Sequence, residues 1–482
     1  MSHQPRGRRA ERRSLRLWHI GIVLPLVFTV AIMIAGFVFY TGWDLLDARG
    51  LKKQQKIDSA TLFDLVKLSF GVVAGAGGLV ALVVAYRRQR VDEDAALRDT
   101  TRLHNERFTT AVSQLGDTSP TVRLGGVHAL AGLADDAPTR ELRQTCIDVL
   151  CAFLRLPYTA ESDLPPSDSA ARHDYLALRE ARHTVIRLIR DHLRLPQKDP
   201  QSWQGHDFDF TSTVFDGGDL SEANSSGGVV TFADATFSGG TVNFEDATFS
   251  GGTVDFSFAL FSEGVIDFRR ATFSGGTFNF RIATFSESTV NFRDAVFSGG
   301  TVDMSSVMLT SGTIDFNRAQ FTGTAVDFSY GMFSGGQIGF HHAAFSGGMI
   351  DFSNTEFSGA TDFFTMARFA GATVIFRDAA FSGGEVDFSG VEFSGGEVDF
   401  SGVEFSGGEV DFSGVEFSGG TLTYLGASGS VPRGLLASLG PPCLPVSLWP
   451  RAGSERAGHT DQFPVCWRAA ARRRCAVRSL TP

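Results

Sequence analysis

The sequence predicts an α+β multidomain protein with two transmembrane helices, a small HEAT-like α-helical block and a long β-solenoid. Three observations predict it. Phenylalanine recurs with a period of twelve residues through most of the second half of the chain. A stretch with helical spacing of apolar residues precedes these repeats, and two apolar stretches lie near the N-terminus. A strict period over such a length is typical of a solenoid, in which each unit stacks on its neighbours.

Composition and charge support this division of the chain. The 482 residues include 44 Phe but only 6 Tyr and 5 Trp, which fits one buried position repeated many times. The formal net charge is −10, yet six arginines lie within residues 1–17, a basic tail that is predicted to be cytoplasmic. The repeat region is acidic and contains no Lys. Because an acidic body repels nucleic acid, we expect no direct nucleic-acid binding.

Two apolar stretches are predicted to cross a membrane. Residues 18–41 supply about the 20 apolar residues that a bilayer requires. Residues 62–86 form the second stretch, although Asp64 and Lys67 lie near its start. Arginines precede the first stretch and follow the second, so the positive-inside rule places both termini in the cytoplasm and residues 42–61 in an external loop. The predicted location is the cell membrane, as a multi-pass protein that contacts the lipid bilayer through two transmembrane helices.

Residues 92–198 are predicted to form a helical block. Apolar residues recur there at helical spacing, in three short helices followed by a longer one from Ala170 to Leu195. Cys146 and Cys151 lie five residues apart, a spacing that favours buried, reduced thiols over a metal pair. The role of the block is open between a HEAT-like module and a folded cover for the first coil of the solenoid.

Residues 205–424 hold the repeats, and each 12-residue unit supplies two short strands. Val242 and Phe244 lie two residues apart, so both side chains share one face of a strand, and Ala247 and Phe249 repeat the arrangement. A two-residue corner alternates with a wider corner rich in glycine, the residue that reaches positive φ without strain. Two units would then close a coil of 24 residues; the alternative is a flattened 12-residue coil.

Asn243-Phe244 and Asp315-Phe316 show the core of the repeat, an inward Phe preceded by Asn or Asp. In this pattern the chain resembles the pentapeptide-repeat family, although its steps alternate between five and seven residues. The resemblance implies a right-handed quadrilateral β-helix. The helical block and the lead-in at residues 203–205 look like the segment found in actinobacterial members. The resemblance covers about residues 95–424 and, together with the two predicted spans, implies a membrane-anchored protein of that family.

The outward surface of the solenoid is predicted to be acidic. With 24-residue coils, one face carries a ladder of aspartates: Asp255, Asp303, Asp327, Asp351 and Asp399. Carboxylates stacked ~5 Å apart repel each other by roughly 1 kcal/mol per pair in water. Two interpretations are open: the ladder binds cations or mimics the DNA backbone, or each Asp simply caps its own corner. A cluster of arginines interrupts the acidic surface: Arg269, Arg270, Arg281 and Arg293.

No motif for catalysis, cofactor binding or metal binding occurs in a suitable context. His341 and His342 are adjacent in a predicted strand and should point to opposite faces, which argues against a shared metal. We therefore predict no enzyme activity, no cofactor, and no catalytic, cofactor-binding or metal-binding residue. Residues 425–482 lack the period and are predicted to be a disordered tail.

The favoured hypothesis is a non-catalytic, membrane-tethered scaffold whose rigid acidic solenoid faces the cytoplasm and binds an unidentified cytoplasmic protein. The alternative is a DNA-mimicking binder or inhibitor of a topoisomerase, as some pentapeptide-repeat proteins are. The acidic ladder motivates the alternative, whereas the predicted membrane anchor counts against it.

Overall fold

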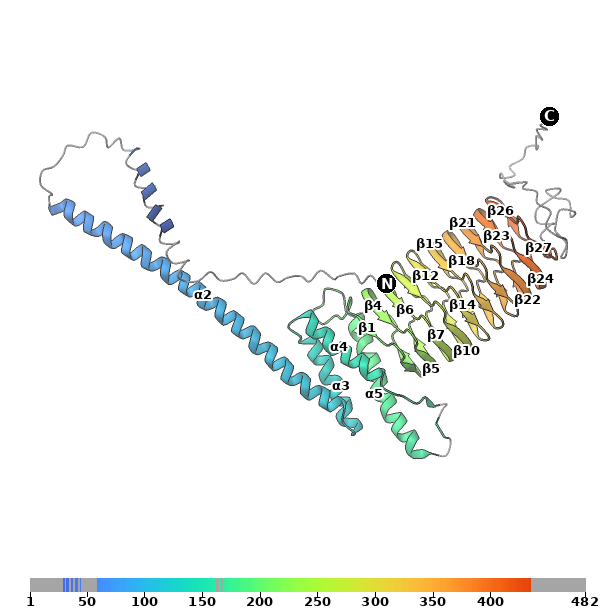
Figure 1. Cartoon of the computed structure of the whole chain (residues 1–482), viewed down its shortest axis with the longest axis horizontal. Coiled ribbons are helices and arrows are strands. Elements are labelled where there is room, and N and C mark those ends of the chain that lie inside the picture. Colours follow the sequence, from blue (N-terminus) through green and yellow to red (C-terminus); the bar gives the residue numbers. More distant parts are fainter. Residues whose placement is uncertain are drawn as a thin grey trace, which may run out of the picture. The chain divides into compact units, whose positions relative to one another are not determined.

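The computed structural model describes residues 59–161, 164–165 and 168–434, together with scattered positions between 29 and 44. The chain divides into two compact units at Leu103. The second unit holds a helical block followed by a β-solenoid (Figure 1).

The long helix α2 runs from Ser59 to Leu115. Asp64 and Lys67 lie 3.4 Å apart near its start and form an exposed ion pair. The helix begins with an apolar stretch and continues from Arg87 with mostly charged and polar residues. Only its last turns, with Ala111 and Leu115, take part in the buried core of the helical block.

The prediction of two transmembrane helices is wrong for the part of the chain that can be tested. Among the described residues, no helix is long and apolar enough to cross a membrane. The predicted span 62–86 lies within α2, which does not meet this requirement over its described residues. The fold class therefore loses its transmembrane component, and the predicted multi-pass membrane location is corrected with it. Most of the predicted span 18–41 and of the loop 42–61 lies outside the described residues, as does much of the predicted tail 425–482.

Three further helices complete the helical block: α3 (Pro120–Asp135), α4 (Arg140–Leu154) and α5 (Ser169–Arg194). Side-chain caps define two of the starts. Thr139 accepts a hydrogen bond from the backbone N–H of Leu142, and Asp168 accepts from those of Ala170 and Ala171. The long last helix that was predicted from Ala170 to Leu195 is α5.

The helices of the block pack closely around a fully apolar centre. Gly126 on α3 lies so near the end of α2 that a Cβ there would meet the Leu115 nitrogen at 2.4 Å. Cys146 and Cys151 on α4 are buried free thiols, as predicted. Burial raises the pKa of Cys146 to about 11 and that of Cys151 to about 12. Both thiols are therefore protonated and unreactive at neutral pH.

The solenoid consists of two parallel sheets, and each coil contributes strands to both of them (Figure 1). It has about nine turns. The 13-stranded sheet contains β1 (Phe208–Asp209), β4 (Asn224–Thr231), β6 (Thr248–Asp255), β8 (Thr272–Phe273), β9 (Thr277–Asn279), β11 (Val296–Phe297), β12 (Thr301–Asp303), β15 (Gln320–Asp327), β18 (Ala344–Asp351), β21 (Arg368–Ile375), β23 (Glu392–Asp399), β25 (Glu416–Phe417) and β26 (Thr421–Thr423). The 14-stranded sheet contains β2 (Val214–Phe215), β3 (Gly218–Asp219), β5 (Thr236–Asn243), β7 (Leu260–Asp267), β10 (Thr284–Asn291), β13 (Met308–Leu309), β14 (Thr313–Asp315), β16 (Met332–Phe333), β17 (Gln337–Gly339), β19 (Glu356–Phe357), β20 (Thr361–Phe363), β22 (Ala380–Asp387), β24 (Glu404–Asp411) and β27 (Ser428–Gly429).

Strand register confirms the 24-residue coil. Phe261 lies beside Phe285, and Val302 lies beside Val326, each pair 24 residues apart. The flattened 12-residue coil is excluded, because consecutive units belong to different sheets. The first turn is shorter, since Phe208 pairs with Val230.

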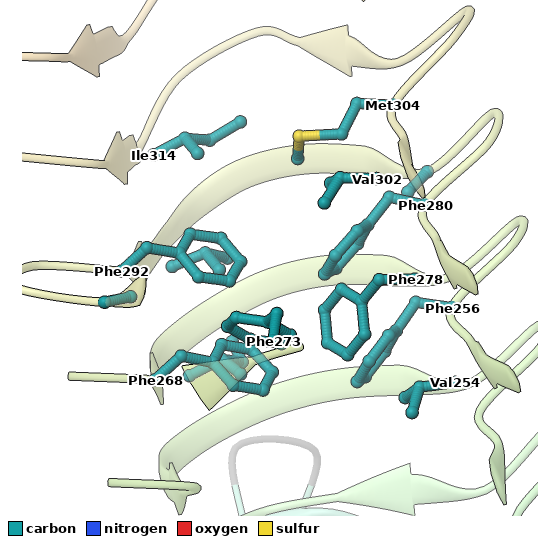
Figure 2. Packing of buried hydrophobic residues seen from close by; sticks show 14 of the residues in the cluster. Val254, Phe256, Phe268, Phe273, Phe278, Phe280, Phe292, Val302, Met304 and Ile314 are labelled. Carbon is teal, nitrogen blue, oxygen red and sulfur yellow. The ribbon is translucent and has the colours of Figure 1, made fainter. Parts of the chain in front are cut away.

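Phenylalanine rings stack in columns in the interior, with Val and Ile side chains beside them (Figure 2). Phe256 and Phe280 lie with centroids 4.8 Å apart and planes within 5°, and Phe268 and Phe292 repeat this at 4.9 Å. The spacing equals the distance between neighbouring strands, so each ring stacks on its counterpart one coil away. Met304 takes the place of Phe in one column and is fully buried.

The two kinds of corner have different causes. At the short corner, the Ala247 N–H donates to the Phe244 carbonyl at 3.0 Å, and Asp246 adopts a positive φ of 59°. At the wide corner, Gly252 has a φ of 78°, and a Cβ there would meet the Gly228 carbonyl oxygen at 2.2 Å. Glycine therefore suits the wide corner where neighbouring coils approach closely, although Thr324 and Ala372 take the equivalent place on later coils.

The stacked rings predict that two substitutions at Phe256 lower the free energy of unfolding by very different amounts. Phe256→Ala should lower the free energy of unfolding by about 3–5 kcal/mol, because it opens a cavity in the stack. Phe256→Met should lower it by less than about 1.5 kcal/mol, because Met304 already occupies the same column. Urea unfolding followed by circular dichroism measures both, and equal losses would contradict the role of the stack.

Strain at a corner predicts a stabilising substitution. Ile282 is β-branched and has a φ of 62°, a conformation that disfavours such side chains, whereas Asn354 occupies the equivalent position with a φ of 56°. Ile282→Asn should therefore raise the free energy of unfolding by about 1 kcal/mol. Thr284→Asn, on the strand two residues later, serves as the control and should not stabilise. Thermal unfolding would refute the idea if Ile282→Asn lowered the midpoint.

Candidate interaction surface

The predicted acidic ladder exists as a column on the 13-stranded sheet. Asp303, Asp327 and Asp351 lie in register on consecutive coils. The column is not continuous, because Asn279 and Ile375 occupy two of its positions. The face that the 24-residue spacing predicts is therefore formed, but its negative charge is interrupted.

Each aspartate of the ladder has a structural role at its own corner. Oδ1 of Asp303 accepts a hydrogen bond from the backbone N–H of Ser305 at 2.9 Å, and Oδ1 of Asp327 accepts from Ser329 at 2.8 Å. Asn279 caps the N–H of Arg281 in the same way at 2.9 Å. Because Asn replaces Asp without loss of this bond, the corner requires a side-chain oxygen and not a negative charge.

Arginines neutralise part of the acidic surface. Arg377 approaches the Oδ2 atom of Asp399 to 2.6 Å, and Arg270 binds Asp246 through two nitrogens at 2.8 and 2.9 Å. Burial raises the pKa of Asp399, but hydrogen bonds from Ser401 and Arg377 outweigh it and hold the pKa below its usual value. Arginines thus neutralise the acidic surface at these positions, and the solenoid is not a uniform acidic rod.

A shallow groove of about 470 Å³ lies where Gly339 takes the place of the usual Asp or Asn. Asn317 from the preceding coil fills this position, and its Oδ1 accepts a hydrogen bond from the His341 N–H at 2.7 Å. A Cβ at Gly339 would meet that oxygen at 2.9 Å. Arg293 and Asp315 close one end of the groove as an ion pair of 3.2 Å. Asn317 therefore keeps this corner capped, although Gly339 has no carboxylate.

The two adjacent histidines do not point to opposite faces. His341 and His342 form a corner of the coil, where His342 has a φ of 58°, and their ring centroids lie 4.1 Å apart. The prediction is wrong because a turn, and not a strand, contains them. Across the described part of the chain, no group of three or more His, Cys, Asp or Glu could hold a metal ion.

The helical block covers the first coil of the solenoid through a set of buried polar contacts that the sequence did not reveal. Trp203 is fully buried, donates its indole N–H to Asp135 at 3.2 Å and stacks on His192 with centroids 4.1 Å apart. His192 in turn lies 3.1 Å from the other oxygen of Asp135. Burial lowers the pKa of His192, but the hydrogen bonds to Asp135 and Leu188 outweigh it and raise the pKa overall.

Asp216 is the centre of a second contact group at this junction. Its Oδ2 accepts hydrogen bonds from the hydroxyls of Tyr158 and Tyr175, each at 2.6 Å, and its Oδ1 lies 3.3 Å from His183 Nε2. Arg179 Nε also lies 3.3 Å from Oδ2, as an ion contact that does not have hydrogen-bond geometry. Burial raises the pKa of Asp216, but the hydrogen bonds from His183 and the two tyrosines lower it well below its usual value.

Arg182 joins the helical block to the solenoid backbone. Its side chain is buried and donates to the carbonyl oxygens of Leu154 and Val214, each at 2.5 Å. The guanidinium also lies over the ring of Tyr158 at 4.1 Å. These contacts hold α4, α5 and the first coil together, which supports a covering role for the helical block.

The fold defines a β-solenoid whose inward side chains are phenylalanines and whose outward side chains form surface columns. Residues 210–260 match a family model of pentapeptide repeats, with nine copies. Neither curated proteins nor solved structures gave a match. The family match and the solenoid together confirm the resemblance seen in the sequence: residues 210–260 are pentapeptide repeats, and they lie within the β-solenoid. They do not extend to the membrane anchor that was part of the resemblance.

The contacts around Asp216 predict that loss of its negative charge destabilises the packing of the helical block on the first coil. Asp216→Asn should lower the free energy of unfolding by about 2–3 kcal/mol, because two tyrosine hydroxyls and a histidine lose a buried anionic acceptor. Since folding lowers the pKa of Asp216, its contribution is present at neutral pH and is lost as the pH falls through the folded-state value.

Asp246→Asn is the matched control for this prediction, because Asp246 is exposed at a corner that also accepts Asn. Its effect should stay below about 0.5 kcal/mol. Urea unfolding at pH 7 and pH 3 measures both variants. Equal effects at pH 7 would show that the contact group around Asp216 does not hold the cover in place.

Proposed function

We propose that the protein is a non-catalytic protein-interaction module, whose solenoid presents fixed columns of side chains to a partner protein. The observation that carries the proposal is the in-register stacking of the core, which holds each outward residue at a constant offset from its counterpart one coil away. Such a surface is rigid before binding, so little conformational entropy is lost when a partner binds.

The arrangement of polar groups also favours binding over catalysis. Solenoids of pentapeptide repeats are typically non-enzymatic. The aspartates of the ladder cap corners or pair with arginines, and the most strongly perturbed carboxylate, Asp216, is enclosed at the junction. A nucleophile beside a general base in an open cleft is the arrangement that hydrolytic or transfer chemistry requires. The outward columns of the described coils instead offer side chains for recognition.

Inhibition of a topoisomerase by DNA mimicry gains no specific support from the geometry. Asn279, Ile375 and Gly339 interrupt the acidic columns, and arginines neutralise others. A backbone-like series of phosphates would require an unbroken row of unpaired charges. The interaction-module proposal does not depend on that charge.

Site-specific photo-crosslinking of the full chain tests the proposal. A photoreactive amino acid placed at exposed outward positions of the solenoid should trap a stoichiometric protein partner in living cells. Absence of any trapped protein at every outward column would refute the proposal, as would turnover of a substrate by the purified solenoid.

A charge-neutral variant then separates the two interpretations of the ladder. Asp303→Asn, Asp327→Asn and Asp351→Asn together retain the corner caps, because Asn279 already makes the same bond. Loss of the trapped partner would place the carboxylates in the interface. Retention of the partner would show that the ladder is structural.

A further inference from the structure

One corner of the solenoid exposes large apolar side chains over four consecutive coils. This apolar corner stripe consists of Phe258, Leu260, Ile282, Met308, Tyr330 and Met332. Phe258 is 55% exposed, Tyr330 63% and Met332 52%. Because the phenylalanine columns already fill the interior, none of these side chains is required for the core.

The residues of the stripe lie in two adjacent columns, in which Thr284 and Ser306 are the polar positions on the two middle coils. Leu260, Thr284, Met308 and Met332 are in register on consecutive coils. The corner residues two positions earlier are also linked from coil to coil, since the Phe258 N–H donates to the next coil at 3.0 Å and the Ile282 N–H donates likewise at 3.1 Å. At about 4.8 Å per coil, the stripe is ~14 Å long.

Three corner residues of the stripe adopt an unusual backbone conformation. Phe258, Ile282 and Tyr330 have φ values of 59°, 62° and 58°, a region that favours Gly, Asn and Asp. Bulky side chains there reduce stability without improving packing. Beyond the stripe, the same corner column carries Asn354 and Asp378, residues suited to the turn. Bulky residues with the same φ also occur at the other short corner, as at Arg318 and Met366, so the apolar character of the stripe and not its backbone conformation distinguishes it.

Acidic residues flank the stripe on both sides. Glu263 and Glu287 are exposed, lie in register and follow the stripe by three residues. On the other side, Asp255 and Asp327 precede Phe258 and Tyr330 by three residues, and Asp303 lies in register with Asp327 on the preceding coil. Within the described residues, no arginine, lysine or histidine forms an ion pair with these five carboxylates, and the exposed Arg281 is the nearby cation in sequence. Glu356 ends the strand column after Met332.

Length and charge together define what fits this surface. A helix rises 1.5 Å per residue, so ~14 Å corresponds to about ten residues, with apolar side chains on one face. The acidic flanks attract Lys or Arg beside that face. They repel the anionic headgroups of a membrane surface, and a second copy of the stripe would bring the same negative flanks together.

We propose that the apolar corner stripe binds a cationic amphipathic helix of a partner protein. The inference rests on the proposed function as an interaction module and specifies the site and the chemistry of the partner. The acidic flanks select basic partners, and the apolar column supplies the buried area.

Fluorescence anisotropy with a defined probe tests the proposal on the full chain. The probe is a labelled 14-residue peptide of Leu and Lys in amphipathic helical order. The comparison peptides are the same pattern with Glu in place of Lys, and a Leu/Lys peptide permuted to have no apolar face. We expect the probe to bind at least tenfold more tightly than either comparison peptide.

Variants of the chain locate the binding to the stripe. The double variant Phe258→Asp with Tyr330→Asn introduces residue types found at equivalent corners, so it should fold with at least the stability of the parent chain. The matched control is Met366→Asn, because Met366 is 53% exposed with a φ of 57° but lies on the other short corner of the coil. We expect at least tenfold weaker binding for the double variant and no change for the control.

Charge neutralisation tests the flanks. Glu263→Gln with Glu287→Gln should weaken binding about threefold at low salt and reduce its salt dependence. Equal binding of the Glu peptide, or unchanged binding by the double variant, would overturn the proposal. Self-association, or adsorption to phosphatidylserine vesicles, that the double variant abolishes would overturn it as well, by assigning the stripe to a second copy or to a lipid surface.

Failure here is distinguishable from failure of the proposed function. If photo-crosslinking traps a partner equally well with the parent chain and with the double variant, the interaction module stands and the stripe is not its site. If the partner is lost with the double variant but retained with Met366→Asn, both proposals are supported.

Discussion

The register between the strands of successive coils is the constraint on which the rest of the structure depends. Rings such as Phe256 and Phe280 stack because their strands lie in register on successive coils, and hydrogen bonds between parallel strands require the same register. The repeat of 24 residues satisfies both at once. An insertion within a strand would shift the inward phenylalanine of that strand to the wrong face.

Corner chemistry makes this register possible. At the short corner, the caps from Asp303 or Asn279 satisfy a backbone N–H that the strands leave unpaired. At the wide corner, Gly252 permits the backbones of adjacent coils to approach. The outward aspartates are thus required first by the fold, and any contribution to recognition is added to a structural role. This is why acidic character alone is a poor guide to the function of such a surface.

Solenoids expose an unpaired edge at each end, and here the helical block covers the first one. Buried polar groups make the cover specific: Trp203 binds Asp135, Arg182 donates to two carbonyl oxygens, and Asp216 accepts from two tyrosines. Each of these groups would be unfavourable if it were buried without its partner. The block and the first coil are therefore expected to fold as one cooperative unit.

The sequence by itself determined the solenoid, its inward phenylalanines and the helices of the block, because each depends on a local period that is visible along the chain. It also indicated the aspartate column, which follows from period and alternation. The tertiary structure decided what depends on side chains from distant segments: the role of Asp303 as a cap, the acceptor role of Asp216, and the gathering of Phe258 and Tyr330 on one corner. Hydropathy along the sequence predicted two membrane spans, and no described helix is long and apolar enough to form one.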